Sequence, residues 1–407
     1  MNITILGSTG SIGVNILDVV RQHGERFSVF ALVAGRNLDV LCSQILEFRP
    51  KVVAVADAEA LSLLRERLRE LQIPAQRWPE LDAGPEARVR AATDSEVDFV
   101  MSAIVGVAGL EATYEAVRSR KRVGLANKEV LVASGNLVMK AVRESGAELI
   151  PVDSEHNGAH QCLRAGSSSE VVRLILTASG GPFRDTPANN LWDVTPEQAL
   201  NHPTWKMGRR ITVDSATLMN KGFEVIEACW LFDLKPNQVE VVVHPQSSVH
   251  AMVEYSDGSI IAQISATDMR MPIQYAMTYP ERDRAPVPRL NWDQSRTWTF
   301  AAPDLSKFRL LQLAYEAQTQ GGSATCTLNA ADEVAVEAFL GGRIPFPAIA
   351  ETVKETLQRQ VSSHPRSIAE VLEVDRSSRD LARQIIEQYR RVMVSFGRSG
   401  RAENGGN

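Results

Sequence analysis

Residues 3–13 read Ile3-Thr4-Ile5-Leu6-Gly7-Ser8-Thr9-Gly10-Ser11-Ile12-Gly13, a short β-branched run followed at once by a glycine-rich turn. The turn stands between a predicted strand and the first predicted helix. Glycine permits a tight turn and close approach of the backbone, and free N–H groups at a helix start attract anions. The G-x-x-G-x-x-G spacing differs from the commoner G-x-G-x-x-G, but the context is that of a dinucleotide site. We predict such a site here; the alternative is a glycine-rich turn without a ligand.

Beyond this turn, strands and helices alternate up to about residue 150. β-branched runs predict strands at 28–33, 52–56, 99–104, 123–126 and 148–152, and amphipathic segments such as 61–71 and 128–145 predict helices. Such alternation implies right-handed βαβ units and a parallel, doubly wound sheet. We therefore predict an α/β, Rossmann-like domain over residues 1–150.

After residue 150 the predicted secondary structure changes twice along the chain. Residues 151–279 mix strands and helices and contain a long Gly- and Pro-rich loop at about 180–210, which predicts an α+β domain with a lid. Residues 280–305 are proline-rich and predict a linker. Residues 306–393 show the period of buried helices and predict a helical bundle. The glycine-rich tail, 394–407, is predicted to be disordered.

Composition excludes several classes of protein. The 407 residues carry a net charge of −5, so the chain lacks the basic excess of a nucleic-acid binder. Its longest apolar stretch, 99–110, is too short to span a bilayer, and its start does not resemble a signal peptide. The four scattered cysteines predict neither disulfides nor a thiolate zinc site. We expect a reducing, cytoplasmic location with no membrane and no nucleic-acid partner.

The end of the second predicted strand indicates which dinucleotide binds. It reads Ala34-Gly35-Arg36-Asn37, with Arg36 where NAD sites usually carry an acidic residue. A guanidinium matches a phosphate in shape and charge, so NADP is favoured over NAD.

Two carboxylates follow the last predicted parallel strand. In an extended chain Asp153 and Glu155 point the same way, at the sheet edge where α/β ligands bind. Such oxygen ligands suit Mg²⁺ or Mn²⁺. A solvated acidic turn or a helix N-cap is the other interpretation.

A polar helix face is predicted further along the chain. Helical spacing places Asn220, Lys221 and Glu224 on one face. Together with Ser215 they suggest a phosphate clamp beside a third metal carboxylate, although Lys221 and Glu224 could equally be a surface ion pair. His202 in the lid suggests a substrate contact or a structural histidine, and His156 with His160 lacks the glutamate of a zinc motif.

Six segments, in this order and spacing, resemble the 1-deoxy-D-xylulose 5-phosphate reductoisomerase family. They are 7–13, Ala126-Asn127-Lys128-Glu129, 152–157, 178–183, 201–208 and 213–222. The resemblance extends from the first strand to about residue 393. It implies an NADPH-dependent oxidoreductase and isomerase of non-mevalonate isoprenoid biosynthesis, and a homodimer.

The resemblance also assigns roles to individual residues. NADPH would contact Thr9, Gly10, Ser11, Ile12, Gly35, Arg36, Asn37, Asn127, Glu129 and Gly208. One Mn²⁺ or Mg²⁺ would bind Asp153, Glu155 and Glu224, which with Lys128 are the implied catalytic residues. The phosphorylated sugar would contact Lys128, Ser154, Glu155, Ser179, His202, Ser215, Asn220, Lys221 and Glu224. Trp205 and Met207 would lie on the lid.

The implied reaction converts 1-deoxy-D-xylulose 5-phosphate into 2-C-methyl-D-erythritol 4-phosphate. A divalent metal would polarise the ketone, the carbon skeleton would rearrange to an aldehyde, and NADPH would reduce it. The alternative enzyme is a metal-independent, NADP-dependent Rossmann dehydrogenase of another phosphorylated or acidic substrate. A non-catalytic NADP sensor would need neither the lid nor the acidic pair.

Overall fold

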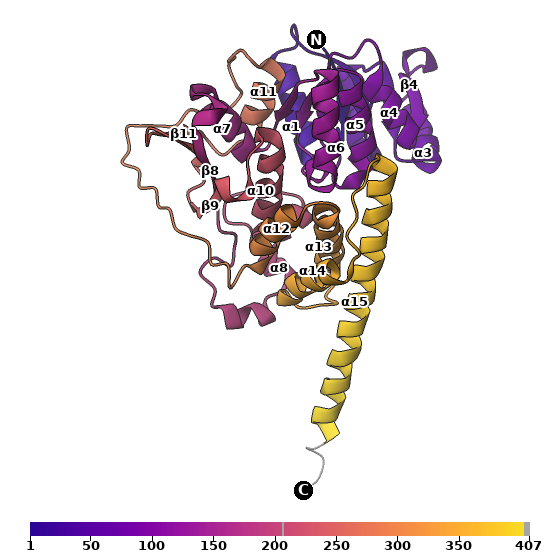
Figure 1. Ribbon diagram of the computed structural model, residues 1–407. Helices are drawn as coiled ribbons and strands as arrows, with labels where there is room; N and C mark the ends of the chain where they lie inside the picture. Colours follow the sequence, from indigo (N-terminus) through magenta and orange to yellow (C-terminus); the bar gives the residue numbers. More distant parts are fainter. Residues whose placement is uncertain (206, 403–407) are drawn as a thin grey trace.

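The computed structural model describes residues 1–205 and 207–402, which form two sheets and a set of covering helices (Figure 1). The strands are β1 Asn2–Leu6, β2 Ser28–Val33, β3 Val52–Val55, β4 Glu80–Ala83, β5 Phe99–Ser102, β6 Arg122–Leu125, β7 Leu149–Pro151, β8 Val171–Ala178, β9 Val239–Val243, β10 Val249–Tyr255 and β11 Ile260–Ile264.

Six helices of the first half pack around the first sheet: α1 Ser11–Gln22, α2 Leu38–Phe48, α3 Ala58–Glu70, α4 Pro85–Thr93, α5 Leu110–Arg118 and α6 Glu129–Ser145. The next helix, α7 Ser154–Cys162, packs on the second sheet. The later helices are α8 Pro196–Ala199, α9 Arg209–Ala216, α10 Met219–Phe232, α11 Arg270–Thr278, α12 Arg309–Gln320, α13 Ala324–Leu340, α14 Pro347–Arg359 and α15 Ile368–Ala402.

The first sheet is parallel, with strand order β4-β3-β2-β1-β5-β6-β7. Central β1 pairs with β2 and β5, so Ile3 lies opposite both Val29 and Phe99. Its strands are buried because helices cover both faces, as in other parallel sheets. The Rossmann-like prediction is therefore confirmed. The sequence missed β4, whose short run Glu80–Ala83 is polar because it lies at the sheet edge.

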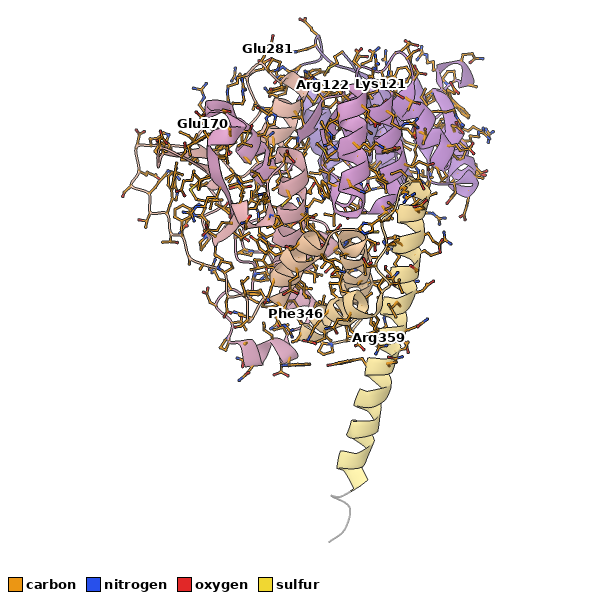
Figure 2. The ribbon with its side chains drawn as sticks, viewed as in Figure 1. Lys121, Arg122, Glu170, Glu281, Phe346 and Arg359 are labelled. Carbon is orange, nitrogen blue, oxygen red and sulfur yellow. The ribbon has the colours of Figure 1, made fainter. Side chains whose placement is uncertain are left out.

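Helix α11 was not predicted, and it joins a core far away in the sequence. Ile273, Tyr275 and Met277 are buried in the same cluster as Ile3 and Ile16. In Figure 1 this helix lies near α1, at the top of the molecule. Arg122, labelled in Figure 2, strengthens the join because its Nη1 donates a 2.8 Å hydrogen bond to the carbonyl of Tyr279.

The second sheet is mixed, with strand order β11-β10-β8-β9. Strand β8 is parallel to β9 and antiparallel to β10, and β10 pairs antiparallel with β11. Its core combines residues of α7, α10 and α12 with Leu174 and Val253 from the strands. This mixture confirms the α+β class predicted for the middle of the chain.

The helix face predicted at Asn220, Lys221 and Glu224 lies on α10, and a second helix, α9, precedes it. Helix α9 ends at Ala216 and α10 begins at Met219, because Leu218 between them adopts a left-handed conformation with φ of 61°. A left-handed residue interrupts an α-helix, and nothing in the sequence marks one at a leucine. The break places Ser215 and Asn220 on different helices.

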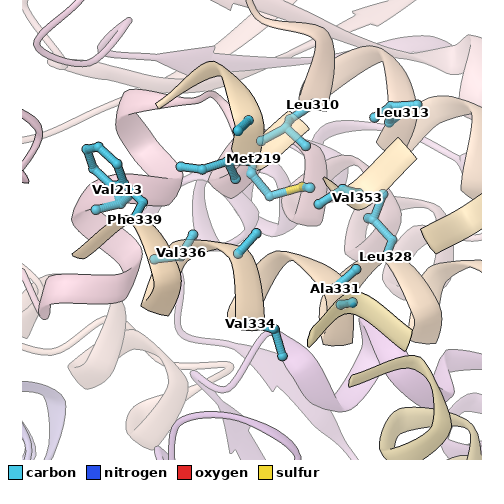
Figure 3. Packing of buried hydrophobic residues seen from close by; sticks show 14 of the residues in the cluster. Val213, Met219, Leu310, Leu313, Leu328, Ala331, Val334, Val336, Phe339 and Val353 are labelled. Atoms are coloured by element: carbon cyan, nitrogen blue, oxygen red, sulfur yellow. The ribbon is translucent and has the colours of Figure 1, made fainter. Parts of the chain in front are cut away.

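The C-terminal helices form the predicted bundle, and its core also takes in residues of α9 and α10, which was not predicted. Figure 3 shows Met219 of α10 among Leu310, Leu328 and Val353. Phe346, labelled in Figure 2, makes edge-to-face contacts with Phe339 and with Phe183, at centroid distances of 5.5 and 5.0 Å. The predicted lid loop is thus tied to this core at its beginning.

Helix α15 reaches Ala402 and extends away from the body in Figure 1. The disordered tail predicted from residue 394 is therefore wrong for 394–402, where isolated glycines cost a helix only about 1 kcal/mol each and do not end it. Residues 403–407 lie outside the described residues.

Between α11 and α12 the chain is extended, and Ala301 pairs with Val243 at the edge of β9. Among the described residues, every helix is too short or too polar to cross a membrane.

Candidate active site

A cavity of about 430 Å³ opens at the carboxyl edge of the first sheet. Its walls come from segments that follow β1, β5, β6 and β7, and from α9 and α10. Ligands of open α/β sheets bind at this edge because the loops after parallel strands converge there. The lining includes many of the predicted site residues: Ser11, Ile12, Asn127, Lys128, Glu129, Asp153, Ser154, Glu155, Ser179, His202, Trp205, Met207, Gly208, Ser215, Asn220 and Lys221.

The glycine-rich turn lies at one end of this cavity. The N–H groups of Gly7 and Ser8 both donate to the carbonyl of Val33, at 2.9 Å, which fixes the turn between β1 and β2. Gly7 has a φ of 94°, and a Cβ there would lie 2.5 Å from the carbonyl oxygen of Ala103. Gly10 caps α1 without a side chain, so the N–H groups at the start of α1 face outward. The turn therefore fits an anionic ligand.

Arg36 lies beyond the end of β2, on the surface. Its guanidinium pairs with Asp57 at 2.8 Å and with Glu59 at 3.4 Å. The guanidinium predicted to contact a 2′-phosphate thus lies at the end of β2, where it already pairs with two carboxylates. Thr9, Gly10, Gly35, Arg36 and Asn37 do not line the cavity itself.

Three carboxylates cluster at one side of the cavity, which Asp153 and Glu155 line and behind which Glu224 is buried. Asp153 and Glu155 follow β7, and Glu224 reaches them from α10; their nearest oxygens all lie within 4.8 Å of one another. Glu224 is completely buried. The fold thus brings together three residues that were grouped from the sequence, although Asp153 and Glu224 are 71 positions apart.

Asp153 both belongs to the carboxylate cluster and caps helix α7, so the helix-cap interpretation is also correct. Its Oδ1 accepts from the N–H of Glu155 at 3.1 Å and caps α7, whereas its Oδ2 pairs with Lys128. Lys128 also lies 3.8 Å from Glu224. Burial alone would raise the pKa of Asp153, but the Lys128 ammonium outweighs it and holds the pKa below its usual value. Asp153 is therefore ionised.

The pKa values of the two glutamates, Glu155 and Glu224, are raised. Burial and the neighbouring carboxylates raise the pKa of Glu155 to about 8, although Lys221 opposes the shift. Burial and Asp153 likewise raise the pKa of Glu224. Packed carboxylates repel each other, and a divalent cation relieves that repulsion. Three hard oxygen donors in one buried cluster therefore fit Mg²⁺ or Mn²⁺.

A polar pocket adjoins the carboxylates. His202 Nε2 lies 3.0 Å from both Ser179 Oγ and Ser215 Oγ, which joins the lid, β8 and α9. Asn220 donates to Glu224 at 2.7 Å, and Lys221 forms an ion pair with Glu224. Lys221 is buried, so the alternative of an exposed surface pair is wrong. Hydroxyl, imidazole, amide and ammonium donors in one pocket are suited to a phosphate.

The histidines of α7 are structural. His156 Nε2 lies 2.8 Å from the carbonyl oxygen of Glu224, and burial lowers its pKa to about 4. His160 contacts the Tyr275 hydroxyl at 2.9 Å. The two histidines therefore have different partners.

Sequence reasoning missed three charged residues in the cavity wall. Arg209, Arg210 and Asp214, all on α9, line the cavity. Arg210 donates to Glu129 at 2.8 Å. The available signal was their position: the two arginines follow Gly208, and Asp214 directly precedes Ser215.

Comparison with protein families gives three matches along the chain. A family model described as 1-deoxy-D-xylulose 5-phosphate reductoisomerase matches residues 3–135. A model of the C-terminal domain of that enzyme matches residues 149–232. A further model, described as DXP reductoisomerase C-terminal domain, matches residues 264–381.

Individual relatives agree with these matches. A protein of Solibacter usitatus named 1-deoxy-D-xylulose 5-phosphate reductoisomerase is 66% identical over 94% of this chain and 96% of its own length. One of the same name from Dechloromonas aromatica is 51% identical over 96% of this chain and 98% of its own.

Solved structures are similar over nearly the whole chain. That of the enzyme from Zymomonas mobilis in complex with NADPH has a TM-score of 0.88 and 43% identity, covering 95% of this chain and 99% of that one. Another, of DOX-P reductoisomerase with NADPH, fosmidomycin and magnesium, has a TM-score of 0.88 and 39% identity, covering 95% and 98%.

Proposed function

This chain belongs to the 1-deoxy-D-xylulose 5-phosphate reductoisomerase family, and we propose that its cavity carries out the family's reaction. The enzyme converts 1-deoxy-D-xylulose 5-phosphate to 2-C-methyl-D-erythritol 4-phosphate with NADPH and a divalent metal ion. The observation that carries the proposal is one cavity that unites a glycine-rich anion turn, three clustered carboxylates and a pocket of phosphate donors.

We propose that the substrate phosphate binds between the lid and α10. The imidazole Nε2 of His202 lies 3.0 Å from the hydroxyl oxygens of Ser179 and Ser215. Two further polar residues, Asn220 and Lys221, lie on α10. His202 Nδ1 accepts the N–H groups of Thr204 and Trp205, so its Nε2 carries the proton and can donate. Phosphate binding here would hold the lid over the reacting carbons.

Asp153, Glu155 and Glu224 would hold the metal. A bound Mg²⁺ or Mn²⁺ supplies Lewis-acid polarisation of the substrate carbonyl. Ser154 donates to Glu155 at 2.8 Å and orients that carboxylate. Lys128 stays protonated, because Asp153 and Glu224 outweigh burial and raise its pKa. Its ammonium would stabilise oxyanion charge beside the carboxylates or move a proton there.

The cofactor would span the cavity from the glycine turn to the base of α6. NADPH supplies the hydride that reduces the rearranged aldehyde. Ser11 and Ile12, at the start of α1, would present backbone N–H groups to its pyrophosphate, and Arg36 would face its 2′-phosphate. Asn127 holds the β5 loop by donating to the carbonyl of Gly106 at 3.0 Å, so this wall of the cofactor site is fixed.

The test is NADPH oxidation by the purified protein with 1-deoxy-D-xylulose 5-phosphate, with added Mg²⁺ or with EDTA. We expect turnover with Mg²⁺ and its loss with EDTA. Turnover that survives EDTA would instead support the metal-independent dehydrogenase.

We also propose a cytoplasmic homodimer. The exposed edge strand β11 carries Ile260 and Ile261, which are 51% and 38% exposed. Apolar side chains at an open sheet edge favour association with another copy. All four cysteines are free and buried, which suits a reducing compartment. Light scattering should give twice the chain mass of 44.7 kDa, and Ile260→Lys should lower it.

The domain division is proposed as 1–150, 151–279 and 306–393, with the linker 280–305 and the lid 180–210. Helix α11 belongs to the second of these segments by sequence but packs in the core of the first. We therefore expect residues 1–150 expressed alone to be less stable than the whole chain.

A further inference from the structure

Arg210 is the centre of a buried charge cluster that joins three parts of the chain. It lies in the first turn of α9, directly after the lid. Its Nη1 donates to Glu129 of α6 at 2.8 Å and to Glu333 of α13 at 2.9 Å, and its Nη2 donates to Asn329 at 2.8 Å. One planar guanidinium thus connects the first sheet's cofactor wall to the C-terminal helices.

The cluster continues into the C-terminal bundle. Glu333 also accepts from Arg379 of α15 at 2.9 Å, and Arg379 pairs with Asp375 at 2.6 Å. The Arg210 side chain is 16% exposed and that of Arg379 is 17% exposed. The two arginines are therefore equally buried, but only Arg210 touches the cavity wall.

Glu129 has little support besides Arg210. It accepts the N–H of Gly106 at 3.1 Å, and otherwise its carboxylate faces the cavity and Arg210. A carboxylate that accepts a charge-assisted bond is held in one orientation more firmly than one that accepts a neutral bond. Loss of Arg210 would leave Glu129 free to turn and would leave a buried cluster of acidic groups without its cation.

We propose that Arg210 is a positioning residue for NADPH, which holds Glu129 in its cofactor-binding orientation and is itself held by Glu333 of the C-terminal bundle. The proposal rests on the proposed function, since Glu129 is a cofactor contact only there. It gives the C-terminal helices a part in cofactor binding although they do not line the cavity.

The test measures NADPH dissociation constants by cofactor fluorescence on the full-length protein without substrate. Arg210→Gln should weaken NADPH binding about 10-fold or more, which corresponds to loss of one charge-assisted hydrogen bond. Arg210→Lys keeps the charge and should recover most of that loss. The matched control is Arg379→Gln, which removes an equally buried arginine that does not touch Glu129 and should change binding less than about twofold.

A double-mutant cycle tests whether Glu333 affects NADPH binding through Arg210. Glu333→Gln should weaken NADPH binding about threefold in the wild-type background and have no further effect in the Arg210→Gln background, because it acts through Arg210. In all these variants the KM for the phosphorylated substrate should stay within about twofold. Equal effects of Arg210→Gln and Arg379→Gln, additive effects in the cycle, or equal losses for both substrates would overturn the proposal.

NADPH binding and turnover by the wild-type protein distinguish failure of this proposal from failure of the proposed function. If the wild type binds NADPH and turns over the substrate, an unchanged Arg210→Gln dissociation constant overturns the positioning role alone. If the wild type does not bind NADPH, both proposals are wrong.

Discussion

Lys221 carries its positive charge in a buried position, between two carboxylates. Burial alone would lower its pKa, but Glu155 and Glu224 outweigh burial and hold the pKa above its usual value. Its ammonium lies 3.8 Å from Glu155 and pairs with Glu224. The lysine therefore contributes both to the proposed phosphate pocket and to the balance of charge in the metal cluster.

Lys221→Ala should consequently lower both activity and stability. An exposed surface pair would contribute little to stability, but Lys221 is buried. Removing one partner of a buried ion pair costs about 3–5 kcal/mol, so the melting temperature in EDTA should fall by several degrees. Added Mg²⁺ should restore part of this loss, because it supplies positive charge to the same carboxylates.

Calorimetric melting with and without Mg²⁺, alongside steady-state kinetics, would check this. The control is Lys140→Ala, which removes an exposed lysine from an i,i+4 pair with Glu144. A Lys221→Ala protein that melts and turns over like the control would exclude Lys221 from the site.

Arg36 is exposed and already paired, which affects cofactor choice. Its partners Asp57 and Glu59 compete with a 2′-phosphate for the guanidinium. Asp57 also caps α3 by accepting the N–H of Ala60 at 2.9 Å, so Glu59 is the cleaner position to change. Glu59→Gln should lower the KM for NADPH about two- to fivefold, as expected for a weak surface pair, and leave that for NADH unchanged. In an Arg36→Ala background Glu59→Gln should have no effect; an effect of the same size there would assign it to another cause.

At the scale of elements, the predicted lid divides into an anchored and an unanchored part. Phe183, Leu191 and Ala199 are buried in the core of the C-terminal helices. Between Ala199 and the start of α9 the described residues are half-buried or exposed, and Trp205 lines the cavity. We therefore expect closure over the substrate to involve residues 200–205 and 207–208 rather than the whole of 180–210.

Tryptophan fluorescence distinguishes the two parts of the lid. Binding of NADPH and substrate should change the fluorescence of Trp205, so Trp205→Phe should abolish most of the ligand-induced signal. Trp192→Phe is the matched control, because Trp192 lies in the short helix Ala188–Asp193 of the anchored part. Loss of the signal in Trp192→Phe, with its retention in Trp205→Phe, would show that the anchored part moves.

Elements with strong local periodicity were predictable from the sequence, and those defined by distant contacts were not. Strands β1 and β2 are continuous apolar runs next to clear turn signals, and they lie where predicted. Strand β4 and helix α11 are set by packing at a sheet edge and against a remote core, respectively. The break at Leu218 needs a left-handed residue that propensity does not mark.

The site divides in the same way. Asp153, Glu155 and Glu224 could be grouped because each sits at a strand end or on a polar helix face with oxygen ligands. Arg210 could not, because a buried arginine looks like a surface arginine in sequence, and its partners Glu129 and Glu333 are 81 and 123 positions away. Burial of charge is a property of the assembled fold.

At the scale of the whole molecule, a carboxyl pair joins α9 to the C-terminal bundle. Burial and the neighbouring Asp332 raise the pKa of Asp214, and burial raises the pKa of Asp332 to about 6. In the unfolded chain an aspartate has a pKa of about 3.9. The folded protein therefore binds more protons than the unfolded chain between about pH 4 and pH 6, and its stability falls as the pH rises through that window.

Asp332→Asn should remove this penalty. The difference in unfolding free energy between variant and wild type should grow from near zero at pH 4 to about 1–3 kcal/mol in favour of the variant at pH 8, since one pKa unit corresponds to about 1.4 kcal/mol. Urea unfolding at several pH values would measure it, with Asp293→Asn in the exposed linker as control. A variant that is less stable than wild type at pH 8 would contradict a shared proton between Asp214 and Asp332.

The proposed reaction is tested most directly by ³¹P NMR of wild-type protein with 1-deoxy-D-xylulose 5-phosphate, NADPH and Mg²⁺. The phosphate signal of the substrate should be replaced by that of 2-C-methyl-D-erythritol 4-phosphate, with one NADPH oxidised for each product molecule, and no conversion in EDTA. NADPH oxidation that leaves the substrate signal unchanged, or a different phosphate ester as product, would contradict the function proposed for this cavity.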